Sequence, residues 1–502
     1  MGGSRVLLAL LLCLSAGSFL VRGEDPYFFY TWNVTYGTIS PLGVPQQGIL
    51  INGEFPGPRI NCSSNNNIVI NVFNNLDEPL LFTCEGPDWN LFLLPSLGMQ
   101  RAAGGIGGLR VNSRLLIPVP FDDPEDDYTV LIGDWYKKSH TVLKKKLDSG
   151  HSIGRPDGVQ INGKSEDKDE PLFTMKPGLT YRYRICNVGI KSSLNFRIQG
   201  HTMKLVELEG SHTVQNVYDS LTCILANAIQ SSTRFLKQVY TAKRIIRYTN
   251  GKGPASPELP EPPSGWIWSL NQFRSFRWNL TASAARPNPQ GSYHYGFINI
   301  TRTIKIVNSA STVDGKLRYA INGVSHTDPT TPPKLAEYFG VVDKVFEYNT
   351  MVDDPPPESA EKIVITPNVL NITFRTFVEI IFENHEKSIQ SWHLNGYSFF
   401  AVAMEPGRWN PDKRKNYNLL DAVSRNTIQV YPGSWTAILL TFDNAGLWNL
   451  RSETWERNYL GQQLYISVLS PARSLRDEYN IPDVAELCGI VKGLPKPQPY
   501  TI

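Results

Sequence analysis

The sequence predicts an all-β protein made of three related β-sandwich domains. Glycine, proline, tyrosine and phenylalanine are abundant, whereas long helical periodicity is scarce. The turn pairs Pro177-Gly178 and Pro432-Gly433 each precede a strand-like segment, a unit that recurs far apart in the chain. The tripeptide Ile-Asn-Gly also recurs at domain-sized spacing, which indicates repeated domains; its copies are 51–53, 161–163 and 321–323.

Each of these elements has a local physical basis. Asn67–Phe73 (NIVINVF) is rich in β-branched residues, and Tyr181–Ile185 (YRYRI) alternates with a period of two, so both are expected to be strands. Trp435–Phe442 (WTAILLTF) follows its turn pair in the same manner. Asn-Gly favours a tight hairpin because both residues tolerate positive φ. We therefore expect a hairpin turn at each Ile-Asn-Gly.

The first 23 residues are typical of a signal peptide. Arg5 provides the positive start, Val6–Leu12 the apolar core, and Val21-Arg22-Gly23 the cleavage region, so we expect the mature chain to begin near Glu24. The apolar run is too short to span a bilayer. The polar, proline-rich C-terminus lacks the tail of a lipid-anchor signal. These features predict a secreted, extracellular chain without a membrane anchor.

Glycosylation signals agree with secretion. Five Asn-x-Ser/Thr triplets are predicted sites of N-glycosylation: Asn33, Asn61, Asn279, Asn299 and Asn371.

Length and charge narrow the classes of protein further. A chain of 502 residues is too long for one hydrophobic core, so two to four domains are expected. The formal net charge is only +3 and acids and bases are intermixed, so nucleic acid is not an expected partner.

Several segments resemble the multicopper oxidases, the family of laccases and ascorbate oxidases. Ile51–Ile60 (INGEFPGPRI) is similar to the opening signature of that family. Segments similar to its second and third domains are Tyr128–Tyr136, Phe196–Gly210, Ser391–Phe400 and Asp443–Gly461. The resemblance implies three cupredoxin-like Greek-key β-sandwiches, with the first at residues 24–119, the second at 120–284 and the third at 285–502.

Other motifs resemble one plant branch of this family, the monocopper oxidase-like proteins. These motifs are PSLGM, AAGGIGGLRVNSRLLIPVPFDDP, NPQGSYHYG and LRDEYNIPD. The branch includes the skewed-growth proteins and the pollen-specific ascorbate oxidase homologues, so the resemblance implies a role in directional cell expansion or pollen-tube growth.

The copper ligands of active relatives are mostly replaced. A blue copper centre needs a Cys thiolate and two imidazoles, and active relatives use more ligand histidines than the eight in this chain. The third-domain motif survives only at His393, the one candidate metal residue, and the His-Cys-His element is replaced by Arg451-Ser452-Glu453. The following histidine is Arg457, and a guanidinium has no lone pair to donate. The alternative interpretation is that His393 is a hydrogen-bonded core residue with a structural role.

The first-domain ligand pairs are missing as well. They would fall near Thr83–Gly86 and Leu93–Ser96, which contain no histidine. The resemblance thus implies copper at partial occupancy at most, and an oxidoreductase family without most of its ligands.

Two stretches depart from the branch. The interval between Thr83 and Pro95 is shorter than in relatives, and Leu221–Arg247 is shorter and irregular, as skipped or misread exons would leave them. A sandwich that loses strands exposes edges and an unfilled core.

The cysteines fit the same account. Five remain beyond the signal peptide, an odd number for an oxidising compartment. In relatives the equivalent of Cys488 pairs with a cysteine of the missing first-domain segment. Cys84 and Cys223 lie in the two disturbed stretches, so Cys62 and Cys186 remain as the candidate bridge between the first two domains.

Three functions are weighed. The first is a non-catalytic extracellular protein of the plant cell wall, and the second is a copper-binding oxidoreductase of the ascorbate oxidase type with reduced copper content. The third is a module that binds wall polysaccharide through the ring faces of Trp266 and Trp268. Expected partners are wall polysaccharide or wall proteins. Loss of the ligands favours the first function.

Overall fold

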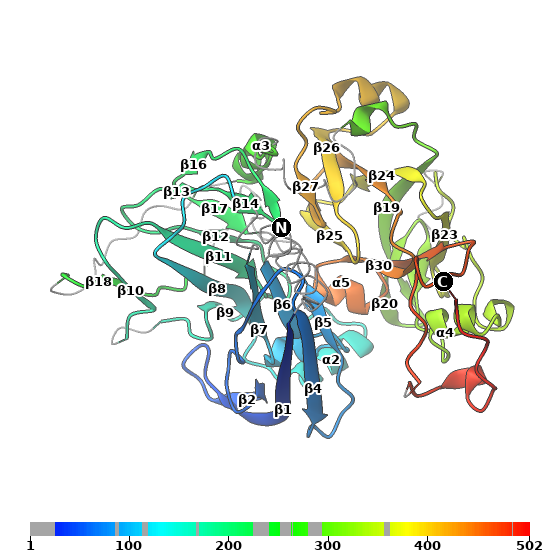
Figure 1. The fold of residues 1–502 in the computed structure, drawn as a ribbon, viewed down its shortest axis with the longest axis horizontal. Coiled ribbons are helices and arrows are strands. Elements are labelled where there is room, and N and C mark those ends of the chain that lie inside the picture. Colours follow the sequence, from blue (N-terminus) through cyan, green and yellow to red (C-terminus); the bar gives the residue numbers. More distant parts are fainter. Residues whose placement is uncertain are drawn as a thin grey trace, which may run out of the picture.

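The structure is a computed structural model that describes residues 26–85, 90–112, 119–166, 170–223, 240–251, 263, 265–279, 294–355, 362–483 and 485–501. The expected signal peptide lies outside these residues. The described chain folds mainly into β-sheets joined by loops and short helices (Figure 1). This confirms the predicted all-β class.

The first part of the chain forms two sheets around one cluster of buried residues. One sheet has the order β2-β1-β4 and the other β3-β7-β6-β5. Both sheets contribute to the cluster, in which Trp32, Ile51, Ile60 and Leu109 are buried. The strands are β1 (Tyr27–Ile39), β2 (Gln46–Ile51), β3 (Ile60–Ser63), β4 (Asn67–Asn74), β5 (Phe82–Glu85), β6 (Asn90–Pro95) and β7 (Gly107–Asn112).

The short interval before Pro95 forms a hairpin in the structure. Strands β5 and β6 pair antiparallel, with Thr83 opposite Leu94. Residues 86–89 and the side chain of Cys84 lie outside the description. Strand β5 ends the order of its sheet, and β4 ends the order of the other. Each therefore has one edge without a partner among the described strands.

The middle part contains a three-stranded sheet and several two-stranded ones. The three-stranded order is β11-β8-β9, and the pairs are β10-β18, β12-β17, β13-β16 and β14-β15. Residues 224–239 of the irregular stretch lie outside the description, while its ends belong to β17 and β18. The strands are β8 (Asp126–Trp135), β9 (Gly158–Ile161), β10 (Phe173–Met175), β11 (Tyr181–Asn187), β12 (Leu194–Phe196), β13 (Met203–Lys204), β14 (Glu207–Leu208), β15 (Ser211–His212), β16 (Val217–Tyr218), β17 (Leu221–Cys223) and β18 (Ile246–Tyr248).

The last part forms an eight-stranded sheet of order β22-β21-β20-β19-β24-β29-β26-β27 and a five-stranded sheet of order β23-β31-β30-β25-β28. Both contribute to a hydrophobic cluster far larger than that of the first part. The strands are β19 (Arg302–Val313), β20 (Lys316–Ile321), β21 (Val324–His326), β22 (Val364–Thr366), β23 (Val369–Thr373), β24 (Phe377–Asn384), β25 (Gln390–Leu394), β26 (Phe399–Pro406), β27 (Ser424–Arg425), β28 (Thr427–Val430), β29 (Ser434–Thr441), β30 (Gly446–Ser452) and β31 (Gln463–Leu469).

Helices are short and lie mostly in the connections. Ser139 caps helix α2 (His140–Asp148), because its side chain accepts a hydrogen bond from the amide of Val142. Within the described residues, no helix combines the length and the apolar character needed to span a membrane. The helices are α2 (His140–Asp148), α3 (Trp266–Ser275), α4 (Pro333–Tyr338), α5 (Trp455–Tyr459) and the 3-10 helices η1 (Gln100–Ala103), η3 (Tyr295–Phe297), η4 (Val342–Lys344), η6 (Pro411–Asn416) and η7 (Gly489–Val491).

The three Ile-Asn-Gly turns are built alike. In every copy the Asn has φ between 46° and 54° and the Gly between 78° and 85°, as a tight hairpin requires. Asn322 accepts a hydrogen bond from the amide of Val307 at 2.8 Å and donates one to the carbonyl of Lys305 at 2.6 Å. Asn52 makes the same two kinds of hydrogen bond to the backbone of β1, and Asn162 makes them to the backbone of β8. This shared device supports three related domains.

We expect Asn322→Ala to lower the free energy of unfolding by about 1–3 kcal/mol, because three part-buried backbone groups, the amide of Val307 and the carbonyls of Lys305 and Val352, lose their side-chain partner and alanine disfavours positive φ. Asn65→Ala is the matched control. Asn65 also has positive φ, but it is exposed, and its side chain accepts a 3.4 Å hydrogen bond from the hydroxyl of Ser64. Denaturant unfolding of both variants measures the difference. Equal losses would show that backbone strain, rather than the side-chain bridge, fixes the turn.

Candidate functional site

His393 lies on β25, inside the five-stranded sheet. Its residue is 5% exposed, and its Nδ1 lies 2.9 Å from the hydroxyl of Thr427. Strand β25 pairs with β30 so that His393 stands opposite Arg451 and Trp392 opposite Ser452. The sheet therefore brings together the third-domain positions that the sequence singled out, with His393 bonded to a hydroxyl and paired in register with an arginine.

A buried ion-pair group occupies this place. The Glu453 carboxylate lies 3.5 Å from the Arg101 guanidinium and 3.2 Å from that of Arg451. All three side chains are at most 6% exposed. Arg101 belongs to η1 in the first part of the chain, so the group ties the first part to the third. We call Arg101, Arg451 and Glu453 the Arg-Glu-Arg group.

Neighbouring contacts hold this group in position. The Arg101 guanidinium stacks over the ring of Trp455 at 5.1 Å, and the indole N–H of Trp455 donates to the carbonyl of Gly98 at 2.7 Å. Arg451 donates a hydrogen bond to Asn395 at 2.9 Å. In Figure 1, helix α5, which carries Trp455, lies beside β5 and β6, between the first and third parts.

A second set of ion pairs connects the segment after β30 to the middle part of the chain. Glu456 accepts from Lys191 at 2.7 Å and from the amide of Ile153 at 3.2 Å. Arg457 pairs with Glu386 and stacks over Tyr319 at 4.8 Å. The segment after β30 thus contacts all three parts of the chain through charged groups.

Another buried carboxylate, that of Asp134, lies near enough to Arg101 to be affected by its charge. Burial raises the pKa of Asp134, although it accepts hydrogen bonds from the amide of Ile190 and the hydroxyl of Ser192 at 2.6 and 2.9 Å. The positive charge of Arg101 offsets part of this rise in pKa, because it favours the ionised carboxylate.

The residues at this place do not fit copper. Copper sites use thiolate and imidazole donors, whereas here the positions of the His-Cys-His element carry a guanidinium, a hydroxyl and a carboxylate. Both guanidinium groups are donor-only and positively charged. Across the part of the chain that the structure describes, no group of three or more His, Cys, Asp or Glu residues could hold a metal ion. His393 therefore lacks the partners that a copper site would need within this part.

Three family models, each described as multicopper oxidase, match residues 33–90, 126–238 and 330–474. The chain is 64% identical to the "L-ascorbate oxidase homolog" of Brassica napus, over all of both chains. It is 42% identical to the "Monocopper oxidase-like protein SKU5" of Arabidopsis thaliana, over 94% of this chain and 91% of the relative. The crystal structure of Fet3p, a multicopper oxidase, superposes with a TM-score of 0.68 at 15% identity, over 88% of this chain and 90% of that one.

The chain therefore belongs to the multicopper oxidase family and has its cupredoxin-like fold. Within that family it is similar to ascorbate oxidase homologues and monocopper oxidase-like proteins, as the sequence motifs predicted. The alignment with the Brassica napus relative has 552 positions against 502 residues here, so at least 50 positions stand opposite gaps in this chain. This supports the prediction that segments of relatives are missing.

The predicted glycosylation sites are mostly accessible. Asn33 on β1, Asn61 on β3, Asn299 and Asn371 on β23 are exposed, whereas Asn279 is half-buried. Modification of these residues stays a prediction.

The predicted bridge between Cys62 and Cys186 is not formed in the structure. Both are free, buried thiols, and they belong to separate hydrophobic clusters on β3 and β11. Burial raises the pKa of Cys186 to about 12, and that of Cys223 to about 12, with a further contribution from the charge of Cys186. Cys488 is free and exposed.

Sequence reasoning missed Arg101 as a partner of Glu453. The sequence did contain a sign of this ion pair. Positions 451 and 453, which carry neutral ligands in active relatives, here carry a guanidinium and a carboxylate. Charged side chains are buried when they are paired with the opposite charge.

Proposed function

We propose that this chain is a secreted, non-catalytic member of the multicopper oxidase family that acts in the plant cell wall, in directional cell expansion or pollen-tube growth. The observation that carries the proposal is the Arg-Glu-Arg group at the place of the copper ligands. The similarity to a monocopper oxidase-like protein and to an ascorbate oxidase homologue supports membership in this branch of the family. The mature protein is proposed to be apoplastic, without a membrane anchor and without nucleic-acid partners.

Electrostatics supports the absence of oxidase chemistry. Two guanidinium charges face one carboxylate, so the group has a net charge of +1. A copper ion placed there would be repelled by the arginines, and such repulsion is strong where water is excluded. Electron entry also needs a thiolate, and the matching position is Ser452, which is 1% exposed.

Wall polysaccharide or wall proteins are the proposed partners. The two tryptophans suggested for sugar stacking do not support this role. Trp266 stacks on Tyr431 with ring centroids 5.6 Å apart and packs against the large core, and Trp268 is half-buried in the same helix. The ring of Trp266 therefore packs within the protein instead of forming an open platform.

We expect the purified protein, incubated with Cu²⁺, to consume no oxygen above the buffer rate when ascorbate or a diphenol is added. It should also lack the intense blue absorption of a Cu–thiolate centre, because Ser452 supplies no thiolate. An ascorbate oxidase carried through the same incubation is the positive control in an oxygen-electrode assay. Copper-dependent oxygen uptake by this chain would favour the alternative function, a copper-binding oxidoreductase.

A further inference from the structure

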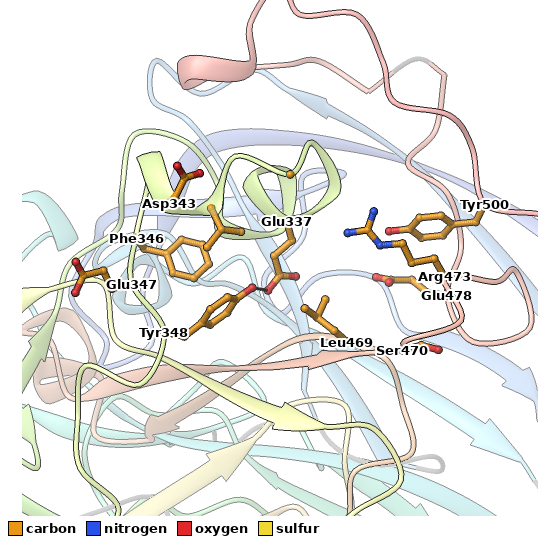
Figure 2. Close-up of a pocket in the computed structure, with 12 residues that line it drawn as sticks. Glu337, Asp343, Phe346, Glu347, Tyr348, Leu469, Ser470, Arg473, Glu478 and Tyr500 are labelled. Carbon is orange, nitrogen blue, oxygen red and sulfur yellow. Dashed lines mark hydrogen bonds between the residues drawn. The ribbon is translucent and has the colours of Figure 1, made fainter.

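A cavity of about 550 Å³ lies in the last part of the chain, and none of the Arg-Glu-Arg residues lines it. Figure 2 shows its wall, formed on one side by α4, η4 and the residues that follow, and on the other by the end of β31 and the C-terminal segment. Its volume falls in the range of small-molecule sites, about 300–1,000 Å³.

A buried carboxylate lies at the centre of the cavity wall. The Glu337 side chain is 2% exposed and accepts hydrogen bonds from the hydroxyls of Tyr348, at 2.9 Å, and Ser467. Lys334 lies 3.4 Å from Glu337 and also pairs with Glu478. The hydrogen bonds and this cation hold the carboxylate in place.

The charged side chains that line the cavity are mainly acidic. They are the carboxylates of Glu337, Asp343, Glu347 and Glu478 and the guanidinium of Arg473. Lys334 lies outside the lining and pairs with both Glu337 and Glu478. Asp343 and Glu347 are exposed and lie on the side away from Arg473, which is exposed as well (Figure 2). A ligand inside therefore meets several carboxylate acceptors and one guanidinium donor.

Aromatic rings line both sides of the cavity. Phe346 and Tyr348 form a T-shaped pair 5.1 Å apart on one side, and Tyr500 enters from the other (Figure 2). Tyr500 is fixed by Asn480, whose amide oxygen accepts from the Tyr500 amide at 2.6 Å, and by ring contact with Tyr338 at 5.3 Å. Burial and then the Glu337 charge raise the pKa of Tyr348, so its hydroxyl stays protonated.

We propose that this cavity binds a neutral sugar residue. A sugar ring has apolar C–H faces that pack on aromatic rings and a rim of hydroxyls that both donate and accept hydrogen bonds. The cavity offers carboxylate acceptors and guanidinium and hydroxyl donors around such rings. Carboxylates accept hydrogen bonds from the hydroxyls of a neutral sugar, and a cationic probe in the test measures the competing attraction of a positive charge. The proposal gives the sugar-binding role a site, and it does not depend on whether copper binds.

The test measures the binding of cellobiose, the probe, to the full chain by saturation-transfer NMR and by calorimetry. Spermidine and digalacturonate, of opposite charge, test the ligand class. Removing the ring in Tyr500→Ala or the donor in Arg473→Ala is expected to weaken binding about tenfold. The matched controls are Tyr479→Ala, at a tyrosine that is 88% exposed, and Arg476→Ala; neither residue lines the cavity.

Arg473 is exposed and Tyr500 lies near the C-terminus, so neither substitution removes part of the core; thermal unfolding checks this. Xylobiose and galactobiose extend the probes to other neutral sugars. The proposal is overturned if none of the three neutral disaccharides binds, if spermidine or digalacturonate binds more tightly than all of them, or if the control substitutions weaken binding as much as the cavity substitutions.

Discussion

Replacing Glu453 with glutamine is expected to destabilise the folded chain by about 3–5 kcal/mol. The substitution removes the carboxylate that faces both Arg101 and Arg451, whose side chains are 0% and 5% exposed. Two guanidinium groups would then face each other in a site that excludes water. Because Arg101 comes from the first part of the chain and Glu453 from the third, the loss should appear in the main unfolding transition rather than in local fraying.

Glu405→Gln is the matched control for this experiment. Glu405 lies 3.4 Å from Lys413, a separation like those in the Arg-Glu-Arg group, but its side chain is 25% exposed and that of Lys413 is 34% exposed. A partly exposed pair of this kind contributes about 0–1 kcal/mol. Urea unfolding of both variants separates burial from distance. Losses of the same size in the two variants would contradict a special role for the buried group.

The first part of the chain is expected to be the least stable, and the chain as written to aggregate or to be secreted poorly. Tyr27 and Phe29 on β1 are 58% and 70% exposed, and Phe73 on β4 is 58% exposed. The pairing of β1 with β4 places all three on one face of the sheet. Contiguous exposed apolar faces favour association, whereas every residue of β24 in the third part is buried.

Hydrogen exchange and light scattering test this expectation. Amides of β1 and β4 should open with a free energy at least about 2 kcal/mol lower than those of β24 and β29. The double variant Phe29→Lys, Phe73→Lys should increase the monomeric fraction of secreted protein. The control pair Phe297→Lys, Tyr479→Lys changes two aromatics outside the sheet that are even more exposed, at 89% and 88%, and should leave that fraction unchanged. Equal protection in β1 and β24, with no gain in monomer, would show that the short first part is complete in itself.

The parts of the fold set by local chemistry could be predicted from the sequence. Alternating and β-branched segments became β4, β11 and β29, and the Asn-Gly pairs took the positive φ that only such residues adopt readily. The family motifs also located the altered copper positions on β25 and β30, which the sheet places side by side.

Features that depend on distant pairing could not be predicted in this way. Arg101 and Glu453 are 352 residues apart in sequence, and the cavity joins α4 to the C-terminal segment. Trp266 lies in a helix that the periodicity of the sequence did not indicate. Its ring packs against the core instead of facing a sugar. The cysteine bridge was inferred from the count of thiols, and the structure keeps Cys62 and Cys186 in different clusters.

The copper content of the purified chain tests the central claim most directly. The protein is dialysed against Cu²⁺, freed of loosely bound metal, and measured for copper per chain by mass spectrometry, with an ascorbate oxidase treated in parallel. Because Arg451, Ser452 and Glu453 stand at ligand positions and Arg101 pairs with Glu453, we expect far less than one tightly bound copper per chain, and no increase in melting temperature on copper addition. Stoichiometric copper that survives dialysis and raises the melting temperature would contradict the account.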